Sequence, residues 1–330
     1  MNVRVVAPGR VNLIGDHTDY TGGLVFPMAI DRYTVITGTR GGDRVSLSSA
    51  DEPEAVDLPL DVAEPQLVEP HWGRYVAGVV AEAAPTAGLR AHVTTNIPIG
   101  AGLSSSAALE VAVAVALGVP GPPTDIARLC QRAEQRASGV PCGIMDQLTI
   151  CAGVAEHALL IDCGVLSVTP VGLPDDAEVV VLFIAHRTLV GSPYAERVAQ
   201  CAAAESVIGP LRSATTEQCH AIDDPVVRAR ALHVTSENER VRRFAHALRE
   251  HQLGEAGRLM VESHRSLADQ YDTSTAQMDA AVEELCALPG VYGARMTGGG
   301  FGGCVVALTQ PGALDRGWRV RAVDGARSVA

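Results

Sequence analysis

The sequence predicts an α+β protein made of two halves. Three observations support this class: β-prone runs crowd the first 50 residues, helical periodicity dominates residues 194–288, and strands and helices are mixed rather than regularly alternating. With 330 residues, of which 47% are hydrophobic, the chain is long enough for two domains, each with its own core. We expect an N-terminal domain over residues 1–165 and a helix-rich C-terminal domain over residues 166–330.

The first half opens with segments rich in Val, Ile and Thr, separated by Gly or charged turns, which is the composition of β-strands. The expected strands are residues 3–7, 24–29, 33–39, 44–48, 91–96 and 159–162. Apolar residues at helical spacing predict helices over residues 72–84, 106–117 and 125–138. For the last of these, Thr124 is the expected N-cap and Gly139 the expected stop.

The second half begins with a predicted strand at residues 178–185 and is then mostly helical. The longer hydrophobic period predicts helices over residues 194–208, 225–248, 253–268 and 278–288. The remaining predicted strands cover residues 292–297, 303–308 and 318–323. The sequence contains no internal repeat, low-complexity tract or Pro/Ser-rich linker that would mark another kind of architecture.

The charge and the choice of basic residue exclude several classes of function. A formal net charge of -12 argues against nucleic-acid or anionic-membrane binding, since both need a basic surface. All 26 basic residues are Arg, and without Lys the chain cannot form a Walker-type phosphate loop or a protein-kinase ATP site. Schiff-base chemistry is excluded for the same reason. A small soluble ligand is therefore expected.

The cysteines and the apolar segments predict a cytoplasmic protein. The eight cysteines are scattered, with no C-x-x-C pair and no Cys/His cluster of metal-ligand spacing, so we expect reduced thiols. Residues 1–6 open a strand and lack the layout of a signal peptide. The most apolar stretch, residues 109–119, is too short to span a bilayer.

A Gly/Ser-rich segment, residues 98–108, lies between a predicted strand and an apolar helix. Its glycines let backbone N–H groups approach a ligand, and the start of the helix adds a positive dipole end. Together these features predict an anion-binding loop suited to the phosphates of ATP, with serine hydroxyls as further donors or Mg²⁺ ligands. A purely structural turn is the alternative for this segment taken alone.

Two further glycine-bounded segments are dense in functional groups. Residues 9–23 place an Arg, an Asn, two Asp and a His between two strands, which suits binding of sugar hydroxyls and phosphate, although Asp and Asn are also common in turns. Residues 298–303 include five glycines, which indicates tight backbone approach or a hairpin turn.

Residues 143–147 carry a candidate general base. Asp146 is flanked by apolar residues, and partial desolvation raises the pKa of a carboxylate toward a useful range. An Asp at the junction of a loop and a helix is also a common N-cap, so the segment alone does not decide its role.

Taken together and in this order, these segments resemble the galactokinases of the GHMP kinase superfamily. Residues 9–23 resemble the galactokinase signature, residues 98–108 the shared phosphate loop, and residues 291–303 the third GHMP motif. The resemblance runs over nearly the whole chain. It implies a two-domain GHMP kinase fold with the active site in the cleft between the domains, and ATP- and Mg²⁺-dependent phosphorylation of a sugar at its anomeric hydroxyl. We expect a monomer or homodimer.

The resemblance also implies roles for individual residues. Asp146 matches the catalytic aspartate, and Arg10 matches the arginine that keeps this aspartate ionised and steadies charge on the transferred phosphoryl group. The residues expected at the sugar are Asp16, His17, Asp19, Gly143 and Tyr194. The residues expected at ATP are Trp72, Pro98, Gly100, Ala101, Gly102, Leu103, Ser104, Ser105 and Ser106. Ser106 and Glu134 are the expected Mg²⁺ partners.

The chain departs from the family pattern on the sugar side, which leaves the acceptor open. Asp16 stands where the signature normally has Glu, Thr21 where Asn is usual, and Gln270 where Asp is common. The shorter Asp16 and the charge of Arg187 allow a galacto-configured acceptor that is extended or phosphorylated at C6, such as a heptose or octose. Conservative drift in a galactose kinase is the alternative.

Two other functions compete with this one. A catalytically silent sugar sensor is disfavoured because both Arg10 and Asp146 are present. A mevalonate or homoserine kinase would share the phosphate loop but not the signature over residues 9–23.

Overall fold

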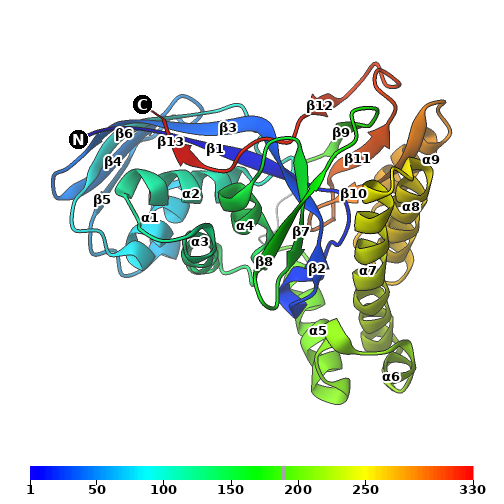
Figure 1. Ribbon diagram of the computed structural model, residues 1–330. Coiled ribbons are helices and arrows are strands. Elements are labelled where there is room, and N and C mark those ends of the chain that lie inside the picture. The colour runs from blue at the N-terminus through cyan, green and yellow to red at the C-terminus, as the bar shows by residue number, and fades with distance from the viewer. Residues whose placement is uncertain (187–190, 330) are drawn as a thin grey trace.

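The computed structural model describes residues 1–186 and 191–329 (Figure 1). It is an α+β structure with three sheets, as the sequence predicts. The first is a six-stranded sheet in the order β13-β1-β3-β6-β4-β5, in which only the β4–β6 pair is parallel. Its strands are β1 (Asn2–Asn12), β3 (Pro27–Arg40), β4 (Arg44–Ser49), β5 (Val56–Pro59), β6 (Leu89–Thr95) and β13 (Arg327–Ser328).

Four helices pack on this first half: α1 (Gly73–Ala83), α2 (Ser105–Leu117), α3 (Pro123–Ser138) and α4 (Met145–Ala152) (Figure 1). The second of these is apolar all round, which is the pattern of a fully buried helix. It packs between β1, β3 and the other three helices, so its first turn is fixed in the core of this half. The phosphate loop therefore leads into the most deeply buried helix of the domain.

The second half is built on a four-stranded antiparallel sheet in the order β10-β11-β9-β12. Its strands are β9 (Glu178–Ala185), β10 (Val291–Thr297), β11 (Gly303–Thr309) and β12 (Trp318–Val320). The helices of this half are α5 (Tyr194–Ile208), α6 (Thr216–His220), α7 (Pro225–Arg249), α8 (Leu253–Asp269) and α9 (Ala276–Cys286). Figure 1 shows α7 and α8 side by side, with α8 against β10, while α5 and α6 project away from the body.

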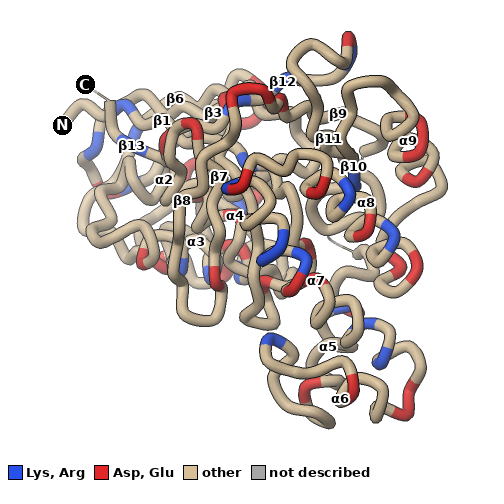
Figure 2. The backbone as a smooth tube through the Cα atoms, turned by 45° about the vertical axis from the view of Figure 1, so that its right-hand side comes forward, with Lys and Arg blue, Asp and Glu red and all other residues tan. Residues whose placement is uncertain are grey.

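Between the halves lies a small antiparallel sheet of β2 (Leu24–Val25), β7 (His157–Asp162) and β8 (Ser167–Gly172), and the chain also forms three short 3-10 helices, η1 (Asp19–Thr21), η2 (Pro65–Leu67) and η3 (Leu211–Ser213). The last strand, β13, returns to pair with β1, so both termini lie at the first sheet (Figure 1). Within the described residues, no helix is long and apolar enough to cross a bilayer. Figure 2 shows Arg positions scattered among Asp and Glu positions in both halves.

Three local expectations were wrong. Residues 24–29 and 33–39 do not form two separate strands: β3 runs unbroken from Pro27 to Arg40, because a bulge opposite Pro8 and Gly9 absorbs the polar residues between the two runs. Helix α3 begins two residues earlier than predicted, with Pro122 rather than Thr124 at its N-cap and Pro123 in its first turn. The expected strand over residues 318–323 ends at Val320.

Apart from the 3-10 helices, five short elements were not predicted at all: β5, β8, β13, α4 and the single turn α6. Each spans eight residues or fewer, so too few residues are present to reveal a period. The stop of α3 at Gly139, in contrast, is confirmed by the left-handed conformation of this glycine. The boundary between domains near residue 165 stays a prediction.

Candidate active site

Two adjacent pockets lie at the predicted site residues and share two of them. The larger, of about 340 Å³, is lined by the phosphate loop and by residues of β3, β4, β6, α1 and α3. The smaller, of about 50 Å³, is lined by the signature segment, the loop before α4, Tyr194 and the third glycine motif. Glu134 and Asp146 line both pockets. A ligand in one pocket therefore meets a ligand in the other at these two carboxylates.

Arg10 and Asp146, which are 136 positions apart in the sequence, form a bidentate pair at this junction. Nε and Nη2 of Arg10 each donate to one carboxylate oxygen of Asp146, both at 2.6 Å. The third guanidinium nitrogen, Nη1, donates to the carbonyl of Gly102 at 2.7 Å. Because β1 supplies the arginine and the first turn of α4 supplies the aspartate, two buried elements hold the pair rigidly against the phosphate loop.

The glycines of the phosphate loop adopt the conformations that their sequence predicts. Gly100 and Gly102 have φ of 74° and 79°, which favours glycine, and Ser104 adopts a left-handed conformation just before α2. The loop is closed onto β1 by a hydrogen bond from the backbone N–H of Arg10 to the carbonyl of Leu103 at 3.2 Å. Five of the loop residues predicted at ATP line the larger pocket, namely Gly100, Gly102, Ser104, Ser105 and Ser106, and Ile99 of the same loop joins them.

The other three loop residues predicted at ATP do not lie in the larger pocket. The side chains of Ala101 and Leu103 are buried in the core, and neither they nor Pro98 lines the larger pocket. Ser104 has a further role that sequence reasoning missed, since its hydroxyl donates to Oδ2 of Asp146. The left-handed backbone at Ser104 gives no sequence signal, because this conformation is uncommon for serine.

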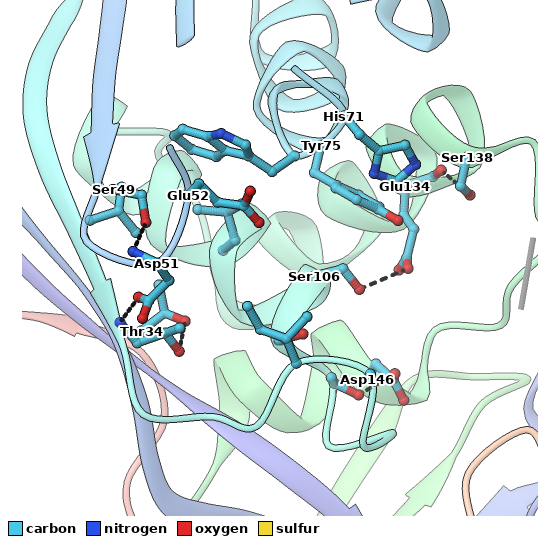
Figure 3. Close-up of a pocket in the computed structure, with 18 of the residues that line it drawn as sticks. Thr34, Ser49, Asp51, Glu52, His71, Tyr75, Ser106, Glu134, Ser138 and Asp146 are labelled. Atoms are coloured by element: carbon cyan, nitrogen blue, oxygen red, sulfur yellow. Dashed lines mark hydrogen bonds between the residues drawn. The ribbon is translucent and has the colours of Figure 1, made fainter. Parts of the chain in front are cut away.

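The far end of the larger pocket is also polar (Figure 3). The indole of Trp72 is buried and donates to the carbonyl of Glu54 at 3.0 Å. Further lining residues that the sequence did not reveal include Ser49, Asp51, Glu52 and His71. They come from a strand end and from loops, where neither periodicity nor a motif marks them.

Ser106 and Glu134 point toward each other in the larger pocket (Figure 3). The hydroxyl of Ser106 donates to Glu134 at 3.2 Å, and the side-chain amide of Gln147 donates to both Glu134 and the buried Glu110. Burial and the nearby Asp146 raise the pKa of Glu134 to about 7. The carboxylate therefore lies where a cation would stabilise its charged form.

Ser106 and Glu134 offer only two oxygen ligands. This number suits Mg²⁺ better than it suits a metal ion whose ligands all come from protein side chains. Mg²⁺ usually takes one or two carboxylates and completes its shell with water and substrate phosphates. Over residues 1–186 and 191–329, no three His, Cys, Asp or Glu side chains gather into a metal cage. Ser106 and Glu134 are the groups that could hold the ion beside a nucleotide in this pocket.

On the sugar side, Asp19 lies directly against Gly143. Burial raises the pKa of Asp19 to about 6, and the neighbouring Asp146 adds to this rise. The backbone N–H of Met145 is 3.5 Å from one of its carboxylate oxygens. A Cβ at Gly143 would lie 1.9 Å from that oxygen and 2.1 Å from the carboxyl carbon, so only glycine leaves room for the carboxylate.

We expect Gly143→Ala to raise KM for the sugar by about ten- to a hundredfold, because the displaced carboxylate of Asp19 loses a charge-assisted hydrogen bond. KM for the nucleotide should not change. Steady-state kinetics with each substrate varied in turn measures both constants. The matched control is Gly254→Ala, since a Cβ there meets nothing within 4 Å. Equal sugar KM values in the two variants would contradict this role of Gly143.

Asp16 was expected at the sugar, and the structure shows that both its oxygens bind protein donors. Oδ2 accepts from Nη1 of Arg295 at 2.5 Å, and Oδ1 accepts from the backbone N–H of Gly298 at 2.9 Å. Asp16 still lines the smaller pocket. Arg295 is itself fully buried, and nothing in the sequence distinguishes it from an exposed strand residue.

His17 and Tyr194 both line the smaller pocket, with ring centroids 5.4 Å apart. The third glycine motif contributes Gly298 and Gly299 to the same lining. Arg187 lies outside the described residues. Thr21 and Gln270, the other departures from the family pattern, do not line either pocket; the side chain of Gln270 accepts from Ser266 at 2.8 Å.

Comparison with known proteins gives consistent matches over most of the chain. The galactokinase galactose-binding signature matches residues 2–40, the GHMP kinase N-terminal domain matches residues 72–154 and the GHMP kinase C-terminal domain matches residues 244–320. Human galactokinase is 44% identical over 335 residues, covering 96% of this chain and 86% of its own length. Galactokinase of Chloroflexus aggregans is 41% identical over 333 residues, covering 94% and 84%.

Comparison with solved structures leads to the same family. The crystal structure of Lactococcus lactis galactokinase complexed with galactose superposes with a TM-score of 0.92 at 29% identity, covering 99% of this chain and 95% of that one. The Methanococcus jannaschii mevalonate kinase has a TM-score of 0.71 at 19% identity, covering 98% and 99%, which shows a shared fold only.

Proposed function

The chain belongs to the galactokinase family of the GHMP kinases and is an ATP-dependent sugar kinase, and from this premise we propose that Arg10 and Asp146 transfer the γ-phosphoryl group of ATP to the C1 hydroxyl of galactose. The observation that carries this proposal is the sharing of Asp146 and Glu134 by the two pockets. ATP in the larger pocket and galactose in the smaller one would meet at the carboxylate of Asp146.

Asp146 accepts the proton of the C1 hydroxyl as this oxygen attacks phosphorus. Its carboxylate is held by Arg10 and Ser104, so its direction is fixed before substrate binds. Arg10 has a second role at the same place, because a guanidinium beside the attacking oxygen stabilises the charge of the transferred group.

The phosphate loop and α2 bind the nucleotide in this proposal. Backbone N–H groups around Gly100 and Gly102, together with the first turn of α2, bind the phosphates. Ser106 and Glu134 would hold Mg²⁺, which when bound supplies neutralising charge to these phosphates.

In the smaller pocket, side-chain acceptors face the hydroxyls of the sugar ring. Asp19 offers carboxylate oxygens, and His17 and Tyr194 complete the wall of the smaller pocket. An acceptor extended at C6 has no described contact in its favour: Asp16 is bound to Arg295 and Gly298, and Arg187 lies outside the described residues. We therefore keep galactose as the proposed substrate.

The proposal is tested by an ADP-release assay over galactose, glucose, galactose 6-phosphate, a C6-extended galactose, mevalonate and homoserine. We expect the highest kcat/KM for galactose, with NMR placing the phosphate on C1. A preference for the C6-modified sugars would move the acceptor to that class. ATP binding without turnover of any sugar would instead support a sensor.

We also infer a cytoplasmic location. All eight cysteines are reduced in the structure, which is usual in a reducing compartment. Fractionation of the native protein with blocking of free thiols would test this.

A further inference from the structure

Behind His17 a row of four side chains leads away from the smaller pocket. Nδ1 of His17 lies 2.9 Å from the hydroxyl of Tyr20, which lies 2.7 Å from the hydroxyl of Tyr271. That hydroxyl in turn lies 2.9 Å from Sγ of Cys201. The four residues come from the signature segment, η1, the turn after α8, and α5, so the row connects both halves of the molecule.

The row is enclosed by protein. Tyr271 is fully buried, Cys201 is 1% exposed and His17 is 4% exposed. The ring of Tyr271 is sandwiched between His17 at 4.7 Å and His233 at 4.5 Å, measured between centroids. Burial raises the pKa of Tyr20 and of Tyr271 well above the ordinary value of a phenol, so both hydroxyls keep their hydrogens.

Counting hydrogens leaves two possible orders along this row. Each tyrosine hydroxyl has a single hydrogen and lies between two partners, so all three bonds point the same way when both hydroxyls donate within the row. In the first order Cys201 donates to Tyr271, Tyr271 to Tyr20, and Tyr20 to Nδ1 of His17. In the reverse order His17 donates from Nδ1, and Cys201 accepts at the far end.

Chemistry favours the first order. A phenol is a better donor than acceptor, because its oxygen lone pair is delocalised into the ring, while the unprotonated imidazole nitrogen is the strongest neutral acceptor in the row. The first order joins these two groups. At the other end the two orders differ little, since a thiol is both a weak donor and a weak acceptor. Aligned hydrogen bonds also polarise and strengthen one another in a buried environment.

We propose that Tyr20, Tyr271 and Cys201 fix the tautomer of His17, so that its hydrogen is on Nε2 and the imidazole acts as a donor to a sugar hydroxyl oxygen. This proposal rests on the proposed function for the identity of the ligand. It gives the smaller pocket both kinds of partner, since Asp19 accepts from hydroxyls while His17 donates to them. A hydroxyl that bridges the two satisfies both its donor and acceptor capacity. Tyr20, Tyr271 and Cys201 are positioning residues, because they act through His17.

The tautomer can be measured without turnover. Long-range ¹H–¹⁵N NMR of the full chain distinguishes a protonated from an unprotonated ring nitrogen, and His17→Gln assigns the signals of His17. We expect an unprotonated Nδ1 and a protonated Nε2 in the wild type. Tyr20→Phe removes the donor to Nδ1, so its spectrum should show a mixture of tautomers. A protonated Nδ1 in the wild type, or an unchanged spectrum in Tyr20→Phe, would overturn the proposal.

Kinetics provide the second readout. Tyr20→Phe should raise KM for galactose by about five- to tenfold, which corresponds to one hydrogen bond, and leave KM for ATP unchanged. Cys201→Ser keeps a donor at the end of the row and should keep the wild-type tautomer, whereas Cys201→Ala should shift it partly. Tyr33→Phe, on β3 outside both pockets, is the matched control. A rise in both KM values would indicate a general structural defect and would contradict the positioning role.

The two proposals fail separately. If the wild type does not phosphorylate galactose, the proposed function is wrong, yet the NMR measurement still determines the tautomer. If galactose is phosphorylated but the tautomer is the reverse, the function stands and the positioning role of this row is wrong.

Discussion

Asp146→Asn is expected to lower kcat by about two to four orders of magnitude, which is the usual contribution of a positioned general base. Asparagine keeps the shape of the side chain and can still accept from Arg10 and Ser104, but it cannot take the proton of the attacking hydroxyl. ATP binding should be unchanged, because the phosphate loop and α2 are not altered. Single-turnover kinetics and calorimetric titration with ATP measure the two quantities.

Asparagine is preferred to alanine for this test. Arg10 is 3% exposed, and alanine would remove both acceptors of its guanidinium at this position, whereas asparagine keeps one oxygen that accepts from it. Removing one partner of a buried ion pair costs about 3–5 kcal/mol of folding free energy, and the retained hydrogen bond limits this loss, so that loss of catalysis is separated better from loss of structure.

A matched control is available in the same half of the protein. Asp162 pairs with Arg212 at 2.9 Å, and its side chain is 25% exposed, compared with 28% for Asp146. Asp162 lines neither pocket. Asp162→Asn should therefore retain wild-type kcat. If Asp146→Asn retained the activity of this control, Asp146 would only orient the hydroxyl and would not act as the base.

The second large effect is on stability. We expect Arg295→Met to lower the free energy of unfolding by about 3–5 kcal/mol, because it leaves the buried carboxylate of Asp16 without the cation that it pairs with. Arg295 is fully buried and pairs with Asp16, and its Nη2 lies 3.9 Å from the fully buried Glu237. Glu237 also accepts from the backbone N–H of Gly15 at 2.9 Å. These contacts join residues 9–23 to β10 and α7. Their loss should therefore weaken the packing between the first and second halves of the molecule.

Urea denaturation followed by circular dichroism measures this change. Asp16→Asn added to Arg295→Met should recover part of the loss, since it removes the charge that Arg295→Met leaves unpaired, while Glu237 keeps its ion pair with Arg240 at 2.6 Å. Arg316→Met is the control: Arg316 pairs with Glu284 at 2.7 Å, but the two side chains are 46% and 60% exposed. A surface change of this kind is expected to stay within about 0.5 kcal/mol. Equal losses for Arg295→Met and Arg316→Met would refute the role given to Arg295.

Much of the fold could be predicted because its longer elements repeat their hydrophobic pattern several times. Strand β9 and helix α5 have the predicted bounds, and α7 and α8 differ from them by one residue. Elements of a few residues, such as α6, escaped because no period develops over such a length. Helix α3 was misplaced at its start because Thr124 is a good capping residue, but Pro123 is equally suited to the first turn.

The sequence alone determined the chemical groups and the loops that carry them: the glycines that turn the phosphate loop, the absence of Lys, and the Arg10 and Asp146 side chains. These properties are local, because conformational preference and functional chemistry belong to a residue and its near neighbours. Only the tertiary structure decided which groups meet. Asp16 pairs with Arg295, which is 279 positions away, and Ser104 donates to Asp146. Tyr20, Tyr271 and Cys201 form a hydrogen-bonded row behind His17. Such pairings depend on how two halves pack and on which buried donors still need acceptors, and no local pattern encodes either.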